Sequence, residues 1–250
     1  MLTFDEIIDS FLRINPTRII VSGENRSLSY KELADNGSLL SSYLINLGLC
    51  KGDRVALLAY NCVEYAEIFY ATSKSGSIIT PINFRLGLLE IIEVLKDSKA
   101  KFFIFQKYFL NIYKELLNLN LIKDKNSIII GKISDKNFCK PYHKIFTKKS
   151  HKFCSYKKKS KPEDLWSLMY TSGTTGKPKG VLRNHSGYYM LSFVTAAELS
   201  IVREDNALIV MPLCHANSFN FFCAYIFAGA SITIYSKKNF DPKHFFDLIK

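Results

Sequence analysis

Segments with helical periodicity and short apolar runs alternate along the whole 250-residue chain. Apolar residues recur at helical spacing over residues 4–14, 30–47, 63–75, 88–96, 107–117, 186–198, 216–227 and 242–250. Short apolar runs that are typical of buried strands cover residues 19–22, 54–59, 77–81, 102–105, 127–130, 165–170, 207–211 and 231–235. Alternation of this kind builds parallel sheets covered by helices. We therefore predict an α/β fold with open, mostly parallel sheets and helices on both faces.

A glycine-rich decapeptide, T-S-G-T-T-G-K-P-K-G at residues 171–180, directly follows the apolar run 165–170. Glycines let a backbone approach a bulky anion closely, and hydroxyl and ammonium groups donate hydrogen bonds to phosphate oxygens. Ligands of open α/β sheets bind beyond the carboxyl ends of strands, where this loop lies. We therefore predict a polyphosphate site made by Thr171, Ser172, Gly173, Thr174, Thr175, Gly176, Lys177, Pro178 and Lys179.

The loop differs from the P-loop of ordinary nucleoside triphosphatases. In that loop, G-x-x-x-x-G-K-[ST], a Ser or Thr that holds Mg²⁺ follows the lysine at once. Here Pro178 follows Lys177, and proline has neither a hydroxyl nor a backbone N–H. An ordinary P-loop enzyme is therefore disfavoured.

Residues 170–180, Y-T-S-G-T-T-G-K-P-K-G, resemble the signature of the adenylate-forming, or AMP-binding, enzyme superfamily. Its members include acyl-CoA synthetases, aryl-CoA ligases, luciferases and the adenylation domains of peptide synthetases. Other segments resemble family motifs in the same order, namely L-S-Y-K-E-L at 28–33, G-L-C-K-G-D-R-V-A at 48–56, G-S-I-I-T-P-I-N-F-R-L at 76–86 and M-P-L-C-H-A-N at 211–217. The chain is identified as a member, in the acyl-CoA synthetase branch and covering the N-terminal half only.

The resemblance implies ATP-dependent activation of a carboxylic acid, fatty or otherwise aliphatic, to an acyl-adenylate and then an acyl-CoA thioester. It implies ATP with Mg²⁺ at the loop, coenzyme A as co-substrate, and no metal ion held by protein side chains alone. It also implies that Lys179 contacts phosphate and that His215 orients or gates the reacting carboxylate. A carboxylate is already ionised at pH 7, so this chemistry needs no strong base.

Several residues near the loop are open to a structural interpretation. His215 taken alone is more often a satisfied structural histidine, and structural roles are as probable as functional ones for Arg183 and His185. An aromatic series after His215 favours core packing, with an acyl pocket as the alternative. Its members are Phe219, Phe221, Phe222, Tyr225 and Phe227.

Motifs that the family carries further along its chain are missing here, including the G-Y-G-x-T-E segment, the T-G-D carboxylate and a late lysine. We therefore expect residues 1–250 to form an incomplete N-terminal AMP-binding domain without the C-terminal domain that would contact coenzyme A, and to be inactive alone. The alternatives are a non-catalytic ATP-binding half that needs a separate partner chain, a decayed fragment, and a basic interaction protein.

The formal net charge of +12 is concentrated in one segment, residues 136–161, which holds ten lysines and no acidic residue. Long runs of like charge usually stay solvated, so we interpret 136–161 as a Lys-rich connector within the domain. Peripheral contact with anionic lipid is one alternative. Stacking of single-stranded nucleic acid on Tyr142, Phe146, Phe153 and Tyr156 is another, although no specific nucleic-acid partner is expected.

The six cysteines include no C-x-x-C pair, and the N-terminal residues do not have the pattern of a secretory signal. The longest apolar stretch, 219–235, is interrupted by polar residues and glycine and is short for a membrane span. These features predict reduced thiols and a cytoplasmic protein without a metal cluster.

Overall fold

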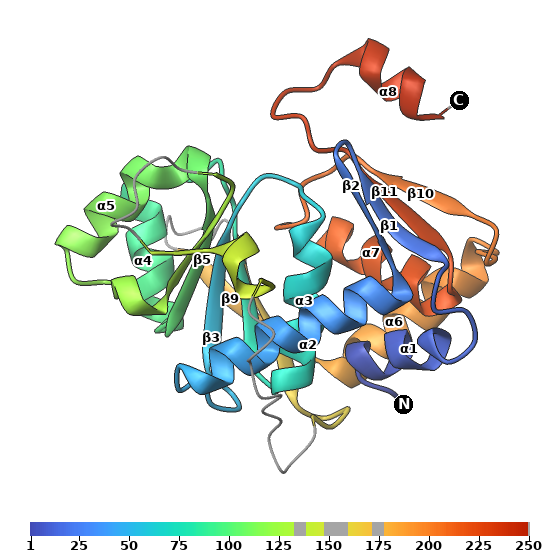
Figure 1. Ribbon diagram of the computed structural model, residues 1–250, viewed down its shortest axis with the longest axis horizontal. Coiled ribbons are helices and arrows are strands. Elements are labelled where there is room, and N and C mark those ends of the chain that lie inside the picture. The colour runs from blue at the N-terminus through green and yellow to red at the C-terminus, as the bar shows by residue number, and fades with distance from the viewer. Residues whose placement is uncertain (133–138, 148–159, 172–177, 250) are drawn as a thin grey trace.

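The computed structural model describes residues 1–132, 139–147, 160–171 and 178–249. Within these ranges the strands form two sheets, and Figure 1 shows them side by side with helices packed between and around them. The expected α/β fold with mostly parallel sheets and helices on both faces is confirmed.

The larger sheet has the strand order β7-β6-β5-β3-β4-β8-β9, and every neighbouring pair is parallel except β8 and β9. Its strands are β3 (Arg54–Leu58), β4 (Ile78–Ile82), β5 (Phe102–Gln106), β6 (Ser127–Ile130), β7 (Lys140–Pro141), β8 (Leu165–Thr171) and β9 (Lys179–Asn184). In the smaller sheet, β10-β11-β1-β2, only the pair β1 and β2 is antiparallel. These strands are β1 (Ile19–Gly23), β2 (Arg26–Ser29), β10 (Asn206–Ile209) and β11 (Ser231–Ile234).

The α-helices follow the expected segments closely. They are α1 (Phe4–Leu12), α2 (Tyr30–Asn46), α3 (Glu64–Ser75), α4 (Leu88–Ser98), α5 (Leu110–Asn118), α6 (His185–Glu198), α7 (Ala216–Ala228) and α8 (Pro242–Ile249). Short 3₁₀ turns are η1 (Lys107–Phe109), η2 (Asp124–Asn126) and η3 (Tyr142–Ile145). The segment 107–117 thus begins as a 3₁₀ turn rather than as an α-helix.

Strand β3 shows how both faces of the larger sheet are covered. Val55 and Leu57 belong to a core cluster shared with α1, α2, α3 and α7, whereas Ala56 and Leu58 belong to a second cluster shared with α4 and α5. Successive side chains of a strand point to opposite faces, so a strand buried on both sides reads as a continuous apolar run. This is why the sequence shows apolar runs without polar alternation.

The segment 28–33 has a structural role at the start of α2. The Glu32 backbone N–H donates to Ser29 Oγ at 3.2 Å, and the Ser29 backbone N–H donates to Glu32 Oε2 at 2.8 Å. This reciprocal pair is a capping box, which satisfies two backbone donors at the helix start.

Part of the Lys-rich segment 136–161 is packed against the core. Cys139, Tyr142 and Ile145 are buried, and the Tyr142 hydroxyl donates to Glu67 at 2.9 Å. Tyr142 is therefore unavailable for stacking on nucleic acid. Phe153, Tyr156 and most of the lysines of this segment lie outside the described residues, so the connector remains a prediction.

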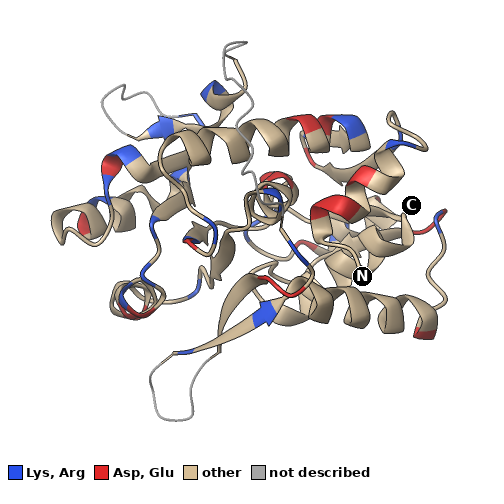
Figure 2. Ribbon diagram, turned by 90° about the horizontal axis from the view of Figure 1, so that it is seen from below, with Lys and Arg blue, Asp and Glu red and all other residues tan. Residues whose placement is uncertain are grey.

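Basic and acidic residues are interspersed over the described part of the chain, as Figure 2 shows. The cysteines that the structure describes, Cys50, Cys62, Cys139, Cys214 and Cys223, are free thiols. No helix in the described ranges has both the length and the apolar character needed to cross a membrane.

Candidate functional site

The predicted phosphate loop connects the two strands of an antiparallel hairpin. Tyr170 pairs with Gly180 and Thr171 pairs with Lys179, so the two ends of the loop leave the sheet side by side. Thr171 and Lys179 are exposed. The remaining predicted residues, Ser172, Gly173, Thr174, Thr175, Gly176 and Lys177, lie outside the described residues.

Gly180 is needed for close approach rather than for an unusual backbone angle. A Cβ atom at this position would lie 2.7 Å from Leu168 Cδ1 and 3.3 Å from the ring of Tyr170. The Tyr170 hydroxyl in turn donates to the Asp97 carboxylate at 2.5 Å. The absence of a side chain at Gly180 therefore lets β9 pair with β8 while the ring of Tyr170 packs against the glycine.

A cavity of about 480 Å³ opens beside this hairpin. Thr171 and Pro178, from the two ends of the loop, and His215, from the start of α7, all line it. The structure thus brings together residues that are far apart in the sequence. Lys179 adjoins Thr171 in the hairpin, but its side chain does not line the cavity.

His215 is half-buried and occupies the N-cap position of α7. Burial lowers the pKa of His215, and the nearby positive charge of Arg85 lowers it further. The imidazole is therefore neutral at pH 7. A neutral imidazole can orient a carboxylate oxygen or a phosphate oxygen by donating one hydrogen bond.

Sequence reasoning missed Asn61, which holds the loop that carries His215. Its side-chain amide donates to the Met211 carbonyl at 2.9 Å, and its side-chain oxygen accepts from the Leu213 backbone N–H at 2.8 Å. Ser218 Oγ also donates to the Met211 carbonyl at 2.9 Å. The turn after β3 therefore holds residues 211–213, which lead directly to His215. No signal in the sequence alone links segments so far apart.

Other residues singled out in the sequence have packing roles. Arg183 donates to Asn220 Oδ1 at 2.9 Å and lies over the ring of Tyr188, and His185 is buried against Trp166. The aromatic residues after His215 are buried or pack against the core, and none of them lines the 480 Å³ cavity. Core packing thus accounts for them in the described part of the chain.

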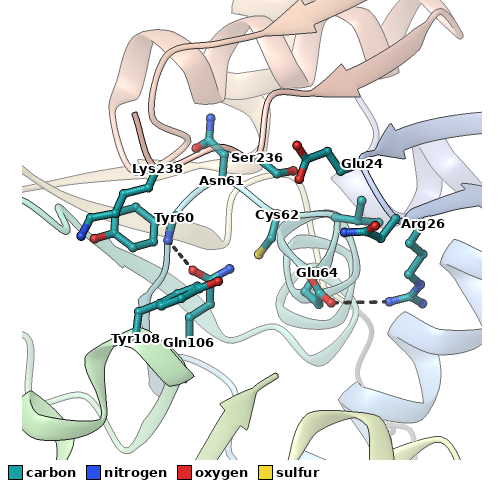
Figure 3. A pocket seen from close by; sticks show the side chains of 12 residues that line it. Glu24, Arg26, Tyr60, Asn61, Cys62, Glu64, Gln106, Tyr108, Ser236 and Lys238 are labelled. Carbon is teal, nitrogen blue, oxygen red and sulfur yellow. Dashed lines mark hydrogen bonds and ion pairs between the residues drawn. The ribbon is translucent and has the colours of Figure 1, made fainter. Parts of the chain in front are cut away.

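A second cavity, of about 320 Å³, lies at the carboxyl ends of β3 and β5 (Figure 3). Its lining mixes both charges, with Glu24, Glu64, Arg26 and Lys238 among its residues. The Tyr60 backbone N–H donates to Gln106 Oε1 at 2.9 Å across its floor. No residue of the predicted phosphate site lines this cavity.

The donors beside the hairpin fit a nucleotide better than a bare cation. Thr171 offers a hydroxyl, Lys179 an ammonium group and His215 a neutral imidazole, all of which can donate to phosphate oxygens. Within the ranges that the structure describes, no group of three His, Cys, Asp or Glu side chains could hold a metal ion. A magnesium ion here would be held mainly by phosphate oxygens.

Open α/β sheets with such donors at the end of a strand are typical of nucleotide-binding domains. Residues 9–250 match the family model described as "AMP-binding enzyme", and the chain belongs to this family.

Curated relatives of the chain include CoA ligases. It is 26% identical over 208 residues to 4-hydroxybutyrate–CoA ligase 2 of Metallosphaera sedula, a match that covers 81% of this chain and 38% of the relative. It is 27% identical over 231 residues to a feruloyl-CoA synthase of an Amycolatopsis species, a match that covers 92% of this chain and 43% of that relative. The chain thus spans less than half the length of these relatives.

A solved structure confirms the fold. The inhibitor-bound N-terminal domain of FACL13 from Mycobacterium tuberculosis superimposes with a TM-score of 0.86 at 24% identity. The match covers 100% of this chain and 60% of that one. The arrangement of the two sheets is therefore that of the N-terminal domain of adenylate-forming enzymes.

Proposed function

We propose that this chain is the N-terminal part of an AMP-forming carboxylate–CoA ligase. The observation that carries the proposal is the cavity where Thr171 and Pro178, at the two ends of the phosphate loop, meet His215. Membership of the AMP-binding family and the likeness to CoA ligases support it.

In the proposed reaction, an oxygen of the substrate carboxylate attacks the α-phosphorus of ATP. A new P–O bond forms, the bond between the α-phosphorus and the bridging oxygen breaks, and pyrophosphate leaves with that electron pair. The carboxylate is already ionised, so no side chain needs to remove a proton. Coenzyme A then displaces AMP through its thiolate, giving the thioester.

The described residues would act by positioning and by electrostatic stabilisation. Thr171 and Lys179 would donate to the oxygens of the β- and γ-phosphates, and fixed donors stabilise charge that grows on those oxygens. His215, which lines the same cavity as Thr171, would orient the carboxylate. Bound Mg²⁺ would neutralise phosphate charge.

We propose an aliphatic acid as the substrate. Ile82, Leu86, Val94 and Met169 give its wall an aliphatic character. The named relatives act on an aliphatic hydroxy acid and on an aromatic acid, so they do not choose between these classes. Contact with coenzyme A is assigned to a region of the relatives that this chain does not span. A cytoplasmic location belongs to the same proposal, and the free thiols of the described cysteines support it.

The test is acid-dependent formation of pyrophosphate by the protein in its full natural length. It would be incubated with ATP, Mg²⁺ and single acids, with butyrate, octanoate and palmitate set against benzoate and alanine. We expect AMP and pyrophosphate with an aliphatic acid, and a thioester after coenzyme A is added. Formation of ADP, or AMP release that no acid stimulates, would contradict the proposal. ATP binding by residues 1–250, with turnover only after a separate polypeptide is added, would instead support the two-chain alternative.

A further inference from the structure

A small cavity of about 150 Å³ lies away from the residues of the proposed active site. It is lined by the end of α1 and the segment after it, by the first residue of α2, by the loop before β10 and by the end of α7. None of its seven lining residues belongs to the 480 Å³ cavity, and none is acidic.

Two arginines give this small cavity a positive charge. Arg18 donates to the backbone carbonyl of Arg203, and the Arg203 guanidinium lies 5.2 Å from the centroid of the Phe11 ring. In the part of the chain that the structure describes, neither guanidinium forms an ion pair with a carboxylate. No carboxylate of the described residues therefore neutralises the positive charge, and Arg203 faces solvent.

Tyr30 supplies a donor that lacks an acceptor. The side chain is 1% exposed, and its hydroxyl has no hydrogen-bond partner among the described residues. Burial raises the pKa of Tyr30 to about 12, although both Arg18 and Arg203 favour its ionised form. At pH 7 the hydroxyl is a neutral donor close to both guanidinium groups. Buried polar groups of native proteins nearly always have partners, so this one indicates an acceptor from outside the chain.

The chemistry of the lining selects an anion over water. One water occupies roughly 30 Å³ of liquid, so the cavity has room for a larger group. A water molecule could accept from Tyr30, but unlike an anion it carries no charge that would neutralise the two partly solvated arginines. Phosphate oxygens can accept from the hydroxyl and from both guanidinium groups, and arginine forms bidentate hydrogen bonds to phosphate.

We propose that the cavity between α1, α2 and α7 binds a phosphate group, with Tyr30, Arg18 and Arg203 as its donors. The side-chain amide of Asn15, which also lines the cavity, can donate to the same group. The phosphate can belong to free inorganic phosphate or to a phosphate monoester, which share this chemistry. The site would bind its ligand independently of the phosphate loop.

The test is thermal unfolding of the protein in inorganic phosphate up to about 20 mM, with ionic strength held constant by chloride, because a ligand of the native state raises the melting temperature. We expect a rise for the wild type, and binding weakened about tenfold or more in Arg203→Met. Arg13→Met, at an exposed arginine outside the cavity, should respond like the wild type. Lys179→Met should keep the part of the response that Arg203→Met loses, because it alters only the phosphate loop.

Tyr30→Phe gives a second criterion that does not depend on how Arg203→Met folds. Without phosphate it should be at least as stable as the wild type, because the hydroxyl it lacks has no partner. With phosphate it should show a smaller rise in melting temperature. A wild type that does not respond beyond chloride would overturn the proposal. So would a response that Lys179→Met loses and Arg203→Met keeps, since this would place phosphate at the loop.

The source of the phosphate is found by repeating the titration with glycerol 1-phosphate. Tighter binding of this monoester would identify a phosphorylated metabolite as the ligand. Tighter binding of inorganic phosphate would identify the free ion. Either result supports the site, provided that Arg203→Met weakens the binding of inorganic phosphate and of glycerol 1-phosphate.

Discussion

The imidazole of His185 lies parallel to the indole of Trp166, with the ring centroids 5.0 Å apart and an interplanar angle of 14°. His185 Nδ1 accepts from the Phe4 backbone N–H at 3.4 Å. Trp166 belongs to β8 and His185 begins α6, directly after β9. The contact therefore joins α1 to the hairpin that carries the phosphate loop.

This contact predicts a loss of stability in acid. Burial lowers the pKa of His185 to about 3, with a smaller opposing effect from Asp164 and a further lowering by Lys51. The unfolded chain therefore binds the proton at higher pH than the folded chain. The contribution of the neutral His185 to the free energy of unfolding is therefore fully present above the unfolded pKa of about 6.5. It is lost as the pH falls from there towards 3, by up to about 1.4 kcal/mol per pH unit.

Urea unfolding between about pH 4 and pH 7 measures this effect. His185→Phe keeps an aromatic ring against Trp166 but cannot titrate, so its free energy of unfolding should depend less on pH than that of the wild type. His143→Gln, at an exposed histidine, should keep the wild-type slope. Equal slopes for the wild type and His185→Phe would show that His185 is not protonated preferentially on unfolding.

Asn61→Ala should loosen the loop that carries His215. It removes both hydrogen bonds to residues 211–213 and leaves the Leu213 N–H buried without an acceptor, at a cost of about 1–3 kcal/mol. Denaturant unfolding would measure the loss, with the exposed Asn118→Ala as the matched control. If the two variants were equally stable, Asn61 would not hold the loop.

Gly180→Ala should disturb the hairpin below the phosphate loop. The added Cβ would lie 2.7 Å from Leu168 Cδ1, and because this is the far end of a side chain that can shift, we expect a cost of about 1 kcal/mol, the low end of the range for overpacking. In a double-mutant cycle, Leu168→Ala should relieve part of this loss. The double variant should therefore lose less unfolding free energy than the two single variants lose together. Strict additivity would show that the two residues do not collide.

Glu67 links the described part of the Lys-rich segment to the core. It is fully buried and accepts hydrogen bonds from Arg26, from Asn36 at 2.8 Å and from Tyr142 at 2.9 Å. Glu67→Ala leaves the buried Tyr142 hydroxyl without its acceptor and removes the main partner of the partly exposed Arg26 guanidinium, so it should cost about 2–3 kcal/mol in unfolding free energy. Tyr142→Phe removes one donor and should cost about 1 kcal/mol. A Glu67→Ala variant no less stable than Tyr142→Phe would contradict this account.

Much of the fold could be predicted because buried strands and amphipathic helices have clear patterns. Strands β2, β7 and β9 were not predicted. Residues 179–184 are half-buried or exposed and contain lysine, glycine, arginine and asparagine, so β9 exists through its pairing with β8. β7 has two residues, and β2 is a short polar strand held by the turn after β1.

The site could be predicted only where a local motif carries it. The resemblance at 170–180 and 211–217 predicted the loop and His215 as site residues, and the structure brings Thr171, Pro178 and His215 to one cavity, while their functional roles remain a proposal. The pairing of the two loop ends in a hairpin was not predicted, because the sequence of β9 does not have the pattern of a strand. Asn61 and the cavity beside Tyr30 were missed because both depend on contacts between distant segments, which periodicity and spacing do not reveal.

The most direct test of the proposed function is acid-dependent exchange of labelled pyrophosphate into ATP, catalysed by the full-length protein. Lys179→Met removes an ammonium group beside the loop and should reduce the exchange by roughly 10²–10³-fold, as expected when a donor to developing charge is lost. Lys125→Met, at an exposed lysine of η2, should exchange at the wild-type rate. Exchange by Lys179→Met at that same rate, or wild-type exchange that needs no acid, would contradict the assignment of this hairpin as the site of carboxylate adenylation.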